Sequence, residues 1–115
     1  MKNKTYDLAY KLNTKLLNSI NQRNLNCLNT NYGISSEMFE EIEDVINSVG
    51  IDLKKMGLKI SRDKLRDIFE YDDGDYGIEA DLVTIDGDRT DLTLITVLRK
   101  IENKYILNYR QIVVM

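Results

Sequence analysis

Residues 76–98 read YGIEADLVTIDGDRTDLTLITVL and contain two alternating runs separated by a turn sequence. Residues at even positions are mostly apolar in 76–84, and the same is true of 92–98. Successive side chains of a strand point to opposite faces, so this alternation predicts two half-buried β-strands. Asp86-Gly87 lies between them and is typical of a type I′ hairpin turn, in which both central residues have positive φ. The stretch therefore predicts a long antiparallel hairpin.

The sequence after this hairpin extends the sheet. Residues 101–104 read IENK and predict another reversal, and 105–114 predict a third strand with Tyr105, Leu107, Tyr109 and Gln111 on one face. Residues 58–60 add a candidate fourth strand. Sequential strands joined by short turns form a meander, and a sheet of this size needs other elements to cover its apolar face.

The first half of the chain supplies the elements that cover the sheet. Apolar residues recur every three or four positions in 3–22, which predicts a helix. Ser35 and Ser36 are good N-caps for a second helix that ends at Gly50. The asparagine-rich stretch 21–36 reads as a loop with one short helical turn at most, and Ser61 is expected to cap a short third helix through Phe69.

These elements predict an α+β fold in which N-terminal helices pack on one face of a C-terminal antiparallel β-meander of three to four strands. We expect one domain over residues 1–115, with a helical half at about 3–69 and the meander at about 76–114. A chain of this length can bury enough surface for a single core.

Composition argues against several classes of function. The chain has no histidine, tryptophan or proline, and Cys27 is its only cysteine. Histidine is the commonest general base and a frequent zinc ligand, so metalloenzymes and Ser-His-Asp enzymes are disfavoured. We expect no metal, no cofactor, no signal peptide and no membrane span, and therefore a cytoplasmic protein. The abundance of asparagine, lysine and isoleucine suggests an AT-rich bacterial or phage genome.

Charge is strongly segregated along the chain. Residues 67–91 hold ten acidic residues and one basic residue, whereas 1–34 carry a net charge of +4. This pattern predicts an acidic surface that binds a basic protein, because complementary potentials speed association. Direct nucleic-acid binding is disfavoured by the pI of about 5.0. The candidate binding residues are Asp72, Asp73, Asp75, Glu79, Asp81, Asp86 and Asp88.

Two other interpretations of these acids stay open. Acidic turns and an acidic edge strand promote solubility and block edge-to-edge pairing. The two Asp-rich turns also carry oxygen ligands suited to calcium, although neither has a complete EF-hand loop.

Tyrosines form a second group of candidate residues. A pocket between the first helix and the sheet, with Glu79 or Asp81 as acid and base, would suit a small-ligand-binding protein or a lyase or isomerase. Core packing with hydroxyls at the rim is the simpler interpretation. The candidate pocket residues are Tyr6, Tyr10, Tyr76, Tyr105 and Tyr109.

The order of elements resembles that of cystatin-like and nuclear transport factor 2-like α+β domains. The segments 76–82, 89–94 and 111–114 look like those of small bacterial proteins within this group. The resemblance implies a curved sheet around a long helix, and it implies fold more than function. Some similar small domains are immunity proteins that neutralise bacterial toxins. Relatives also dimerise through the open sheet face, which Ile95, Val97, Ile106 and Ile112 would permit here.

The sequence therefore predicts a non-enzymatic protein-binding module. The expected type is an immunity protein, whose acidic surface would neutralise a basic toxin such as a nuclease domain. The alternative is the small-ligand-binding protein or enzyme with a pocket between helix and sheet.

Overall fold

A computed structural model describes residues 3–115, which form three α-helices followed by an antiparallel sheet. The described elements are α1 (Asn3–Asn21), α2 (Leu25–Tyr32), α3 (Ser36–Ser48), β1 (Leu58–Ile60), the 3-10 turn η1 (Ser61–Asp63), β2 (Asp67–Glu70), β3 (Tyr76–Thr84), β4 (Arg89–Ile101) and β5 (Lys104–Val114).

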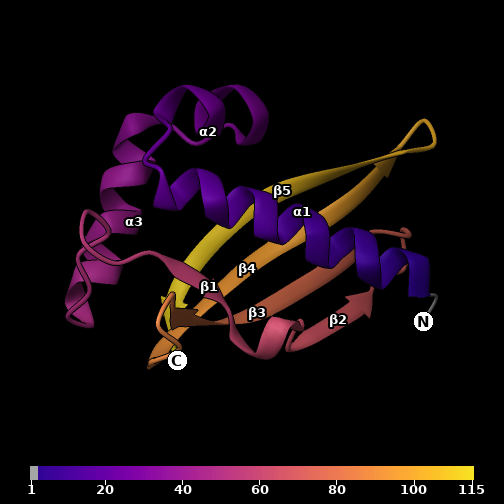
Figure 1. Cartoon of the computed structure of the whole chain (residues 1–115). Helices are drawn as coiled ribbons and strands as arrows, with labels where there is room; N and C mark the ends of the chain where they lie inside the picture. The colour runs from indigo at the N-terminus through magenta and orange to yellow at the C-terminus, as the bar shows by residue number, and fades with distance from the viewer. Residues whose placement is uncertain (1–2) are drawn as a thin grey trace.

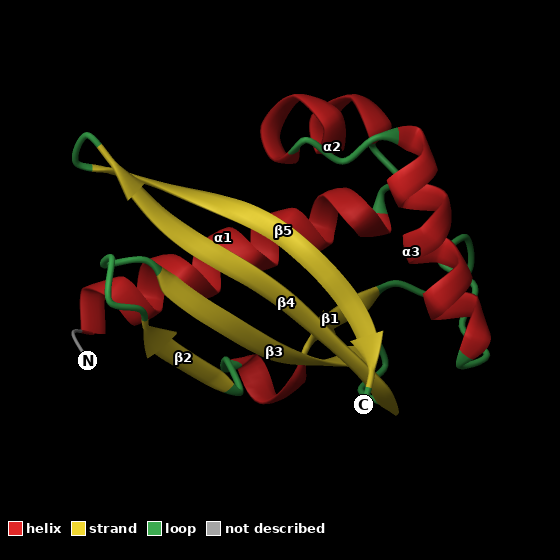
Figure 2. Ribbon diagram, turned by 180° about the vertical axis from the view of Figure 1, so that it is seen from behind, coloured by secondary structure: helices red, strands yellow, loops and turns green. Residues whose placement is uncertain are grey.

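The sheet has the order β1-β3-β4-β5, and β2 pairs with β3 on the same edge as β1. Helix α1 crosses one face of this curled sheet, while α2 and α3 lie beside one end of it (Figure 1). We call the face under α1 the inner face. Seen from behind, no helix of the described chain crosses the opposite, outer face (Figure 2). The predicted α+β fold with helices on one face of an antiparallel sheet is confirmed.

The core lies between α1 and the inner face. Alternate residues of β3 (Ile78, Ala80 and Leu82) are at most 1% exposed, as the alternation predicts. Helix α1 contributes side chains from one stripe at three- and four-residue spacing, which is the helical period. The fully buried apolar residues of that stripe are Ala9, Leu16, Leu17 and Ile20.

Two polar contacts fix α1 against the sheet. Thr96 of β4 donates to Asn13 Oδ1 at 2.8 Å, and both side chains are fully buried. Asn21 donates from Nδ2 to Leu58 O at 2.7 Å and accepts from Leu58 N at 2.8 Å. The Asn21 amide thus bonds β1 in the way a neighbouring strand would, and it joins the end of α1 to the sheet.

Most predicted element boundaries are confirmed. Helix α1 ends one residue before the predicted limit, and the Ser35 side chain caps α3 by accepting from Met38 N at 3.1 Å. Gly50 follows α3 with φ of +83°, a conformation that glycine adopts without strain. Residues 58–60 form the predicted fourth strand.

The segment 21–36 contains a complete helix, α2, where a loop was predicted. The Asn24 side chain accepts from Cys27 N at 3.1 Å at its start. Gly33 ends it in the left-handed conformation, with φ of +68°. Leu28 is its one buried residue, so hydrophobic periodicity gave no signal. The spacing of Asn24 and Gly33 was the available sign of a capped helix.

The predicted third helix at 61–69 is wrong. Ser61–Asp63 form a single 3-10 turn with positive φ at Arg62 and Asp63, and 67–70 pair with β3 as β2. Leu65 does turn inward as expected, and its N–H donates to Tyr6 Oη at 2.8 Å. Pairing with the open edge of β3 satisfies the backbone of this short segment, and an isolated helical turn would not.

The type I′ prediction for Asp86-Gly87 is also wrong. Gly87 has φ of +90°, whereas Asp86 is not among the residues with positive φ. Gly87 N bonds Thr84 O, and Thr84 N bonds Asp88 O, which makes a three-residue loop closed by a glycine bulge. Positive φ at two adjacent residues occurs instead at Glu102 and Asn103, which join β4 to β5.

A bulge in β5 changes which residues face the core. The register shifts between the pair Thr96–Tyr109 and the pair Ile95–Gln111. Ile112 consequently lies on the inner face and is 4% exposed, whereas Gln111 is exposed on the outer side. The predicted placement of Gln111 with Tyr105 and Tyr109, and of Ile112 on the outer face, is therefore wrong.

Candidate functional site

The predicted acidic residues lie near the two opposite ends of β3, on the outer face of the sheet. Asp72, Asp73 and Asp75 lie before β3, and Asp86 and Asp88 lie after it. β3 has nine residues, which at about 3.3 Å per residue places the two turns about 26 Å apart. The seven predicted residues therefore do not form one compact patch.

The two acidic turns have the same local structure. Each contains Asp-Gly-Asp and closes a three-residue loop with the glycine at φ of +90°. In the first turn Asp73 Oδ1 accepts from Asp75 N at 3.0 Å, and in the second the Thr84 hydroxyl accepts from Asp88 N at 3.0 Å. Part of the acidic content therefore serves turn formation.

One end of the outer face is formed by the β2–β3 hairpin, residues 67–79, which we call the acidic hairpin. It contains six acidic residues and no basic residue. Asp75 is its only acid with a basic partner within 4.0 Å among the described residues, namely Arg99 at 3.5 Å. The other five carboxylates have no such partner within the described chain, so the hairpin keeps a strongly negative potential.

Two aromatic rings project from the acidic hairpin. Phe69 and Tyr71 pack edge to face with centroids 5.2 Å apart. They stand over Gly77, where an added Cβ would overlap the Phe69 ring and lie 2.6 Å from Tyr71 Oη. Glycine at this position lets the rings lie directly on the strand. The two residues nevertheless remain 39% and 44% exposed, so together they form an exposed aromatic patch.

The predicted residues in the middle of β3 differ in their surroundings. Glu79 is half-buried and pairs across the strands with Asp67, so it belongs to the acidic hairpin. Asp81 Oδ1 accepts from Thr93 Oγ1 at 3.1 Å and lies 3.4 Å from Arg66 Nη1. Asp81 therefore belongs to a basic environment instead of extending the acidic surface.

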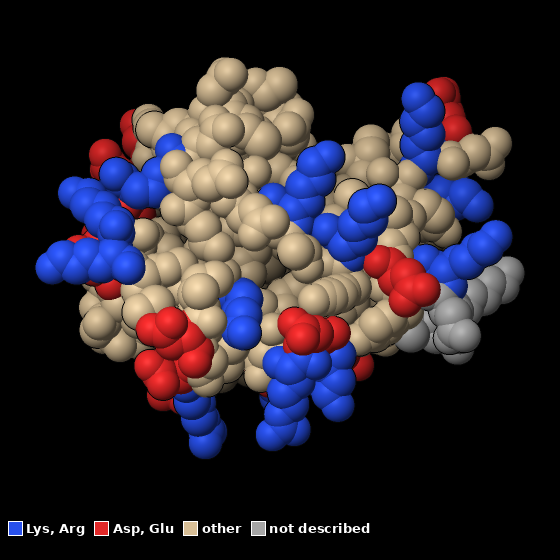
Figure 3. Space-filling model, viewed as in Figure 1, with Lys and Arg blue, Asp and Glu red and all other residues tan. Residues whose placement is uncertain are grey.

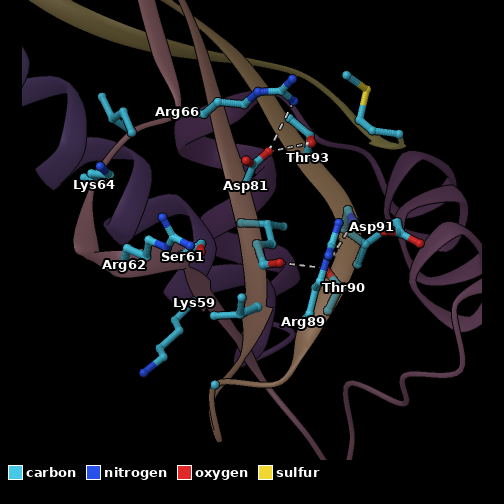
Figure 4. Close-up of a pocket in the computed structure, with 16 residues that line it drawn as sticks. Lys59, Ser61, Arg62, Lys64, Arg66, Asp81, Arg89, Thr90, Asp91 and Thr93 are labelled. Carbon is cyan, nitrogen blue, oxygen red and sulfur yellow. Dashed lines mark hydrogen bonds and ion pairs between the residues drawn. The ribbon is translucent and has the colours of Figure 1, made fainter.

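A groove of about 970 Å³ occupies the other end of the outer face. Its walls are the β1–β2 connection on one side and the start of β4 on the other, with β3 between them (Figure 4). Five basic and two acidic side chains line it, which gives a net charge of +3. The basic residues of this basic groove are Lys59, Arg62, Lys64, Arg66 and Arg89. The count of charges along the sequence gave no sign of the basic groove, because its basic residues are spread over about thirty positions that also contain many acidic residues.

The five predicted tyrosines line neither the basic groove nor the smaller hollow between Arg23, α3 and residues 52–54. Tyr6 Oη and Tyr109 Oη each accept a backbone N–H, from Leu65 and Ile112 respectively. Burial raises the pKa of Tyr109 to about 12, and the charge of Glu41 adds to this, whereas the hydrogen bond from Ile112 opposes it. Tyr10, Tyr76 and Tyr105 are half-buried against the core. These contacts fit packing with hydroxyls at the rim.

The apolar outer positions predicted for a dimer contact are only partly available. Val97 is 9% exposed and Ile112 faces the core, which leaves Ile106 at 42% and the half-buried Ile95.

Other kinds of site find little support in the described part of the chain. Within residues 3–115, no three histidine, cysteine, aspartate or glutamate side chains converge in a way that could hold a metal ion. No helix there is long and apolar enough to cross a membrane. On the face covered by α1, charges of both signs are interspersed with uncharged side chains (Figure 3). The acidic hairpin and the basic groove make the opposite, outer face the candidate binding surface.

The chain belongs to the family described as a domain of unknown function (DUF7668), whose model matches residues 16–115. No curated protein and no solved structure matches the chain. The matched region includes the acidic hairpin and the basic groove.

Proposed function

We propose that this chain is a non-enzymatic protein-binding module that binds a basic partner through the acidic hairpin. The observation that carries the proposal is the exposed Phe69–Tyr71 pair within a hairpin of six acids and no base. Aromatic residues supply much of the binding energy in protein interfaces, and surrounding charges select the partner and speed its approach.

The type of partner follows from this chemistry. An apolar spot surrounded by basic residues would complement the two rings and the carboxylates around them. A nuclease toxin has such a basic surface, because it must bind phosphates. We propose an immunity-type inhibitor that covers this surface and so denies the nucleic acid access to it.

The two Asp-Gly-Asp turns offer a matched experiment. Asp73→Asn with Asp75→Asn removes two charges from the acidic hairpin, and Asp86→Asn with Asp88→Asn removes two charges from the same type of turn at the other end. Asn retains the side-chain acceptor at each position. The partner to test is a basic protein encoded beside this gene, because immunity proteins are normally encoded next to their toxins.

Association rates measured at several salt concentrations distinguish the two turns. The first pair of substitutions should slow association by about three- to tenfold and flatten its salt dependence, and the second pair should change it much less. Phe69→Ala should mainly increase the dissociation rate. Equal effects of both charge pairs, or no binding to the basic neighbour, would contradict the proposal.

A further inference from the structure

The basic groove is a second site on the outer face, separate from the acidic hairpin and independent of the function proposed for it. Among residues 3–115, Arg66 is the only one of its five basic residues with a carboxylate within 4.0 Å. That contact, to Asp81 at 3.4 Å, joins side chains that are both nearly half exposed, so it is weak and exchangeable.

The cations of the groove lie close together and are mostly unpaired. Within residues 3–115 only three ion pairs form, so an unpaired base is ordinary on this surface. Four such cations share one concave surface, however, which concentrates positive potential in the groove. Such a potential favours an anionic ligand.

The local backbone presents these cations from two sides. Arg62 has φ of +57° and Asp63 has φ of +52°, so η1 departs from ordinary helical geometry. A left-handed conformation costs free energy at residues other than glycine, and residues in this conformation are often found at functional sites. Figure 4 shows Arg62 and Lys64 on the wall formed by the β1–β2 connection and Arg89 on the β4 side, while Lys59 lies on β1 with its side chain directed away from Arg89.

The surroundings of the groove restrict the kind of anion. A long nucleic acid that continued along the outer face would meet the six carboxylates of the acidic hairpin. The lining contains no aromatic side chain on which an unpaired base would stack. A peptide lying in the groove cannot add a strand to β3, because β1 and β2 pair with one edge of β3 and β4 pairs with the other.

We propose that the basic groove binds a small anion that carries two or more phosphoryl groups. Its volume of about 970 Å³ is within the range of small-molecule sites. The planar guanidiniums of Arg62, Arg66 and Arg89 can each donate two parallel hydrogen bonds to a phosphoryl group, and Lys59 adds a point charge. The ligand class is a small polyphosphate, because the phosphoryl groups and not a base meet the side chains of the lining.

Isothermal titration of the full chain with pyrophosphate and with ATP, at low salt, tests the proposal. We expect saturable binding with one site per chain. If both probes bind, the phosphoryl groups that they share are sufficient for binding. If ATP binds more tightly than pyrophosphate, the rest of the ATP molecule also contributes to the affinity.

Paired variants assign the binding to the groove. Arg62→Asn with Arg89→Gln removes two guanidiniums, and Asn tolerates the left-handed conformation at position 62. This pair should weaken binding by at least about tenfold. The control, Lys11→Gln with Lys15→Gln, removes two charges from the exposed side of α1 and should leave binding unchanged. Thermal unfolding checks that both variants fold.

Three outcomes would overturn the proposal. The first is no saturable binding of either probe at about 1 mM, the weak end of specific affinity. The second is an equal loss in the groove and α1 variants, which indicates a general effect of net charge. The third is tighter binding of a ten-residue aspartate peptide or a ten-nucleotide single strand, which would assign the groove to a macromolecule. None of these results bears on the acidic hairpin.

Discussion

The hydrogen bond between Thr96 and Asn13 should be a sensitive point of the fold. It joins two side chains with no exposed surface, at 2.8 Å, across the contact between β4 and α1. Thr96→Val keeps the side-chain shape and removes the donor, so Asn13 Oδ1 stays buried without it. An unsatisfied buried group costs about 1–3 kcal/mol, and about 4 °C of melting temperature per kcal/mol applies to a domain of this size. The melting temperature should therefore fall by about 4–12 °C.

Circular dichroism during heating and urea titration measures this change. Asn13→Leu combined with Thr96→Val removes both polar groups together, and this double variant should recover most of the lost free energy of unfolding. Thr30→Val on the exposed side of α2 is the control and should shift stability by less than about 0.5 kcal/mol. If Thr96→Val melts within about 1 °C of the original chain, the bond contributes no net stability and the reasoning about buried polar groups here is wrong.

Three further perturbations test single features. Ser35→Ala should lower the free energy of unfolding by about 1 kcal/mol in urea titration because it removes the α3 cap, whereas Ser36→Ala should be nearly neutral. Gly77→Ala should displace the Phe69 ring, which near-ultraviolet circular dichroism and partner binding would detect; an unchanged spectrum would contradict the packing described. Tyr109 has a folded-state pKa of about 12, above its ordinary value of 10, so its contribution to stability is complete below pH 10 and is lost as the pH rises to 12. Tyr109→Phe should make unfolding less pH-dependent in that interval, and an unchanged profile would argue against the raised pKa.

Strands β3 and β4 were predictable because apolar residues alternate along each of them. In β3, the residues assigned to the inner face are the buried ones, and no tertiary information was needed to choose them. The ends of α3 were predictable for a similar reason, since Ser35 and Gly50 have side-chain and backbone properties that act locally. Properties of this kind are encoded within a few residues.

The failures occurred where distant segments decide the structure. Residues 67–70 have enough apolar character for either a helix or a strand, and the open edge of β3 makes them a strand. The bulge after Tyr109 exchanges the faces of Gln111 and Ile112, and alternation alone carries no sign of it. A single inserted residue is enough to reverse which side chain is buried.

The candidate site could not be predicted for the same reason. Charges were counted along the sequence, whereas the potential at the surface depends on where the folded chain places them. The two acidic turns are close in sequence, but an antiparallel strand carries them to opposite ends of the sheet. Arg89 was the single base within residues 67–91, and folding places it across from Lys59 and Arg62 in the basic groove. A net charge of −3 thus becomes a negative and a positive end on one face. A partner with charges of both signs would bind such a face in one orientation, whereas a uniformly basic partner would engage the acidic hairpin and leave the groove open for a small anion.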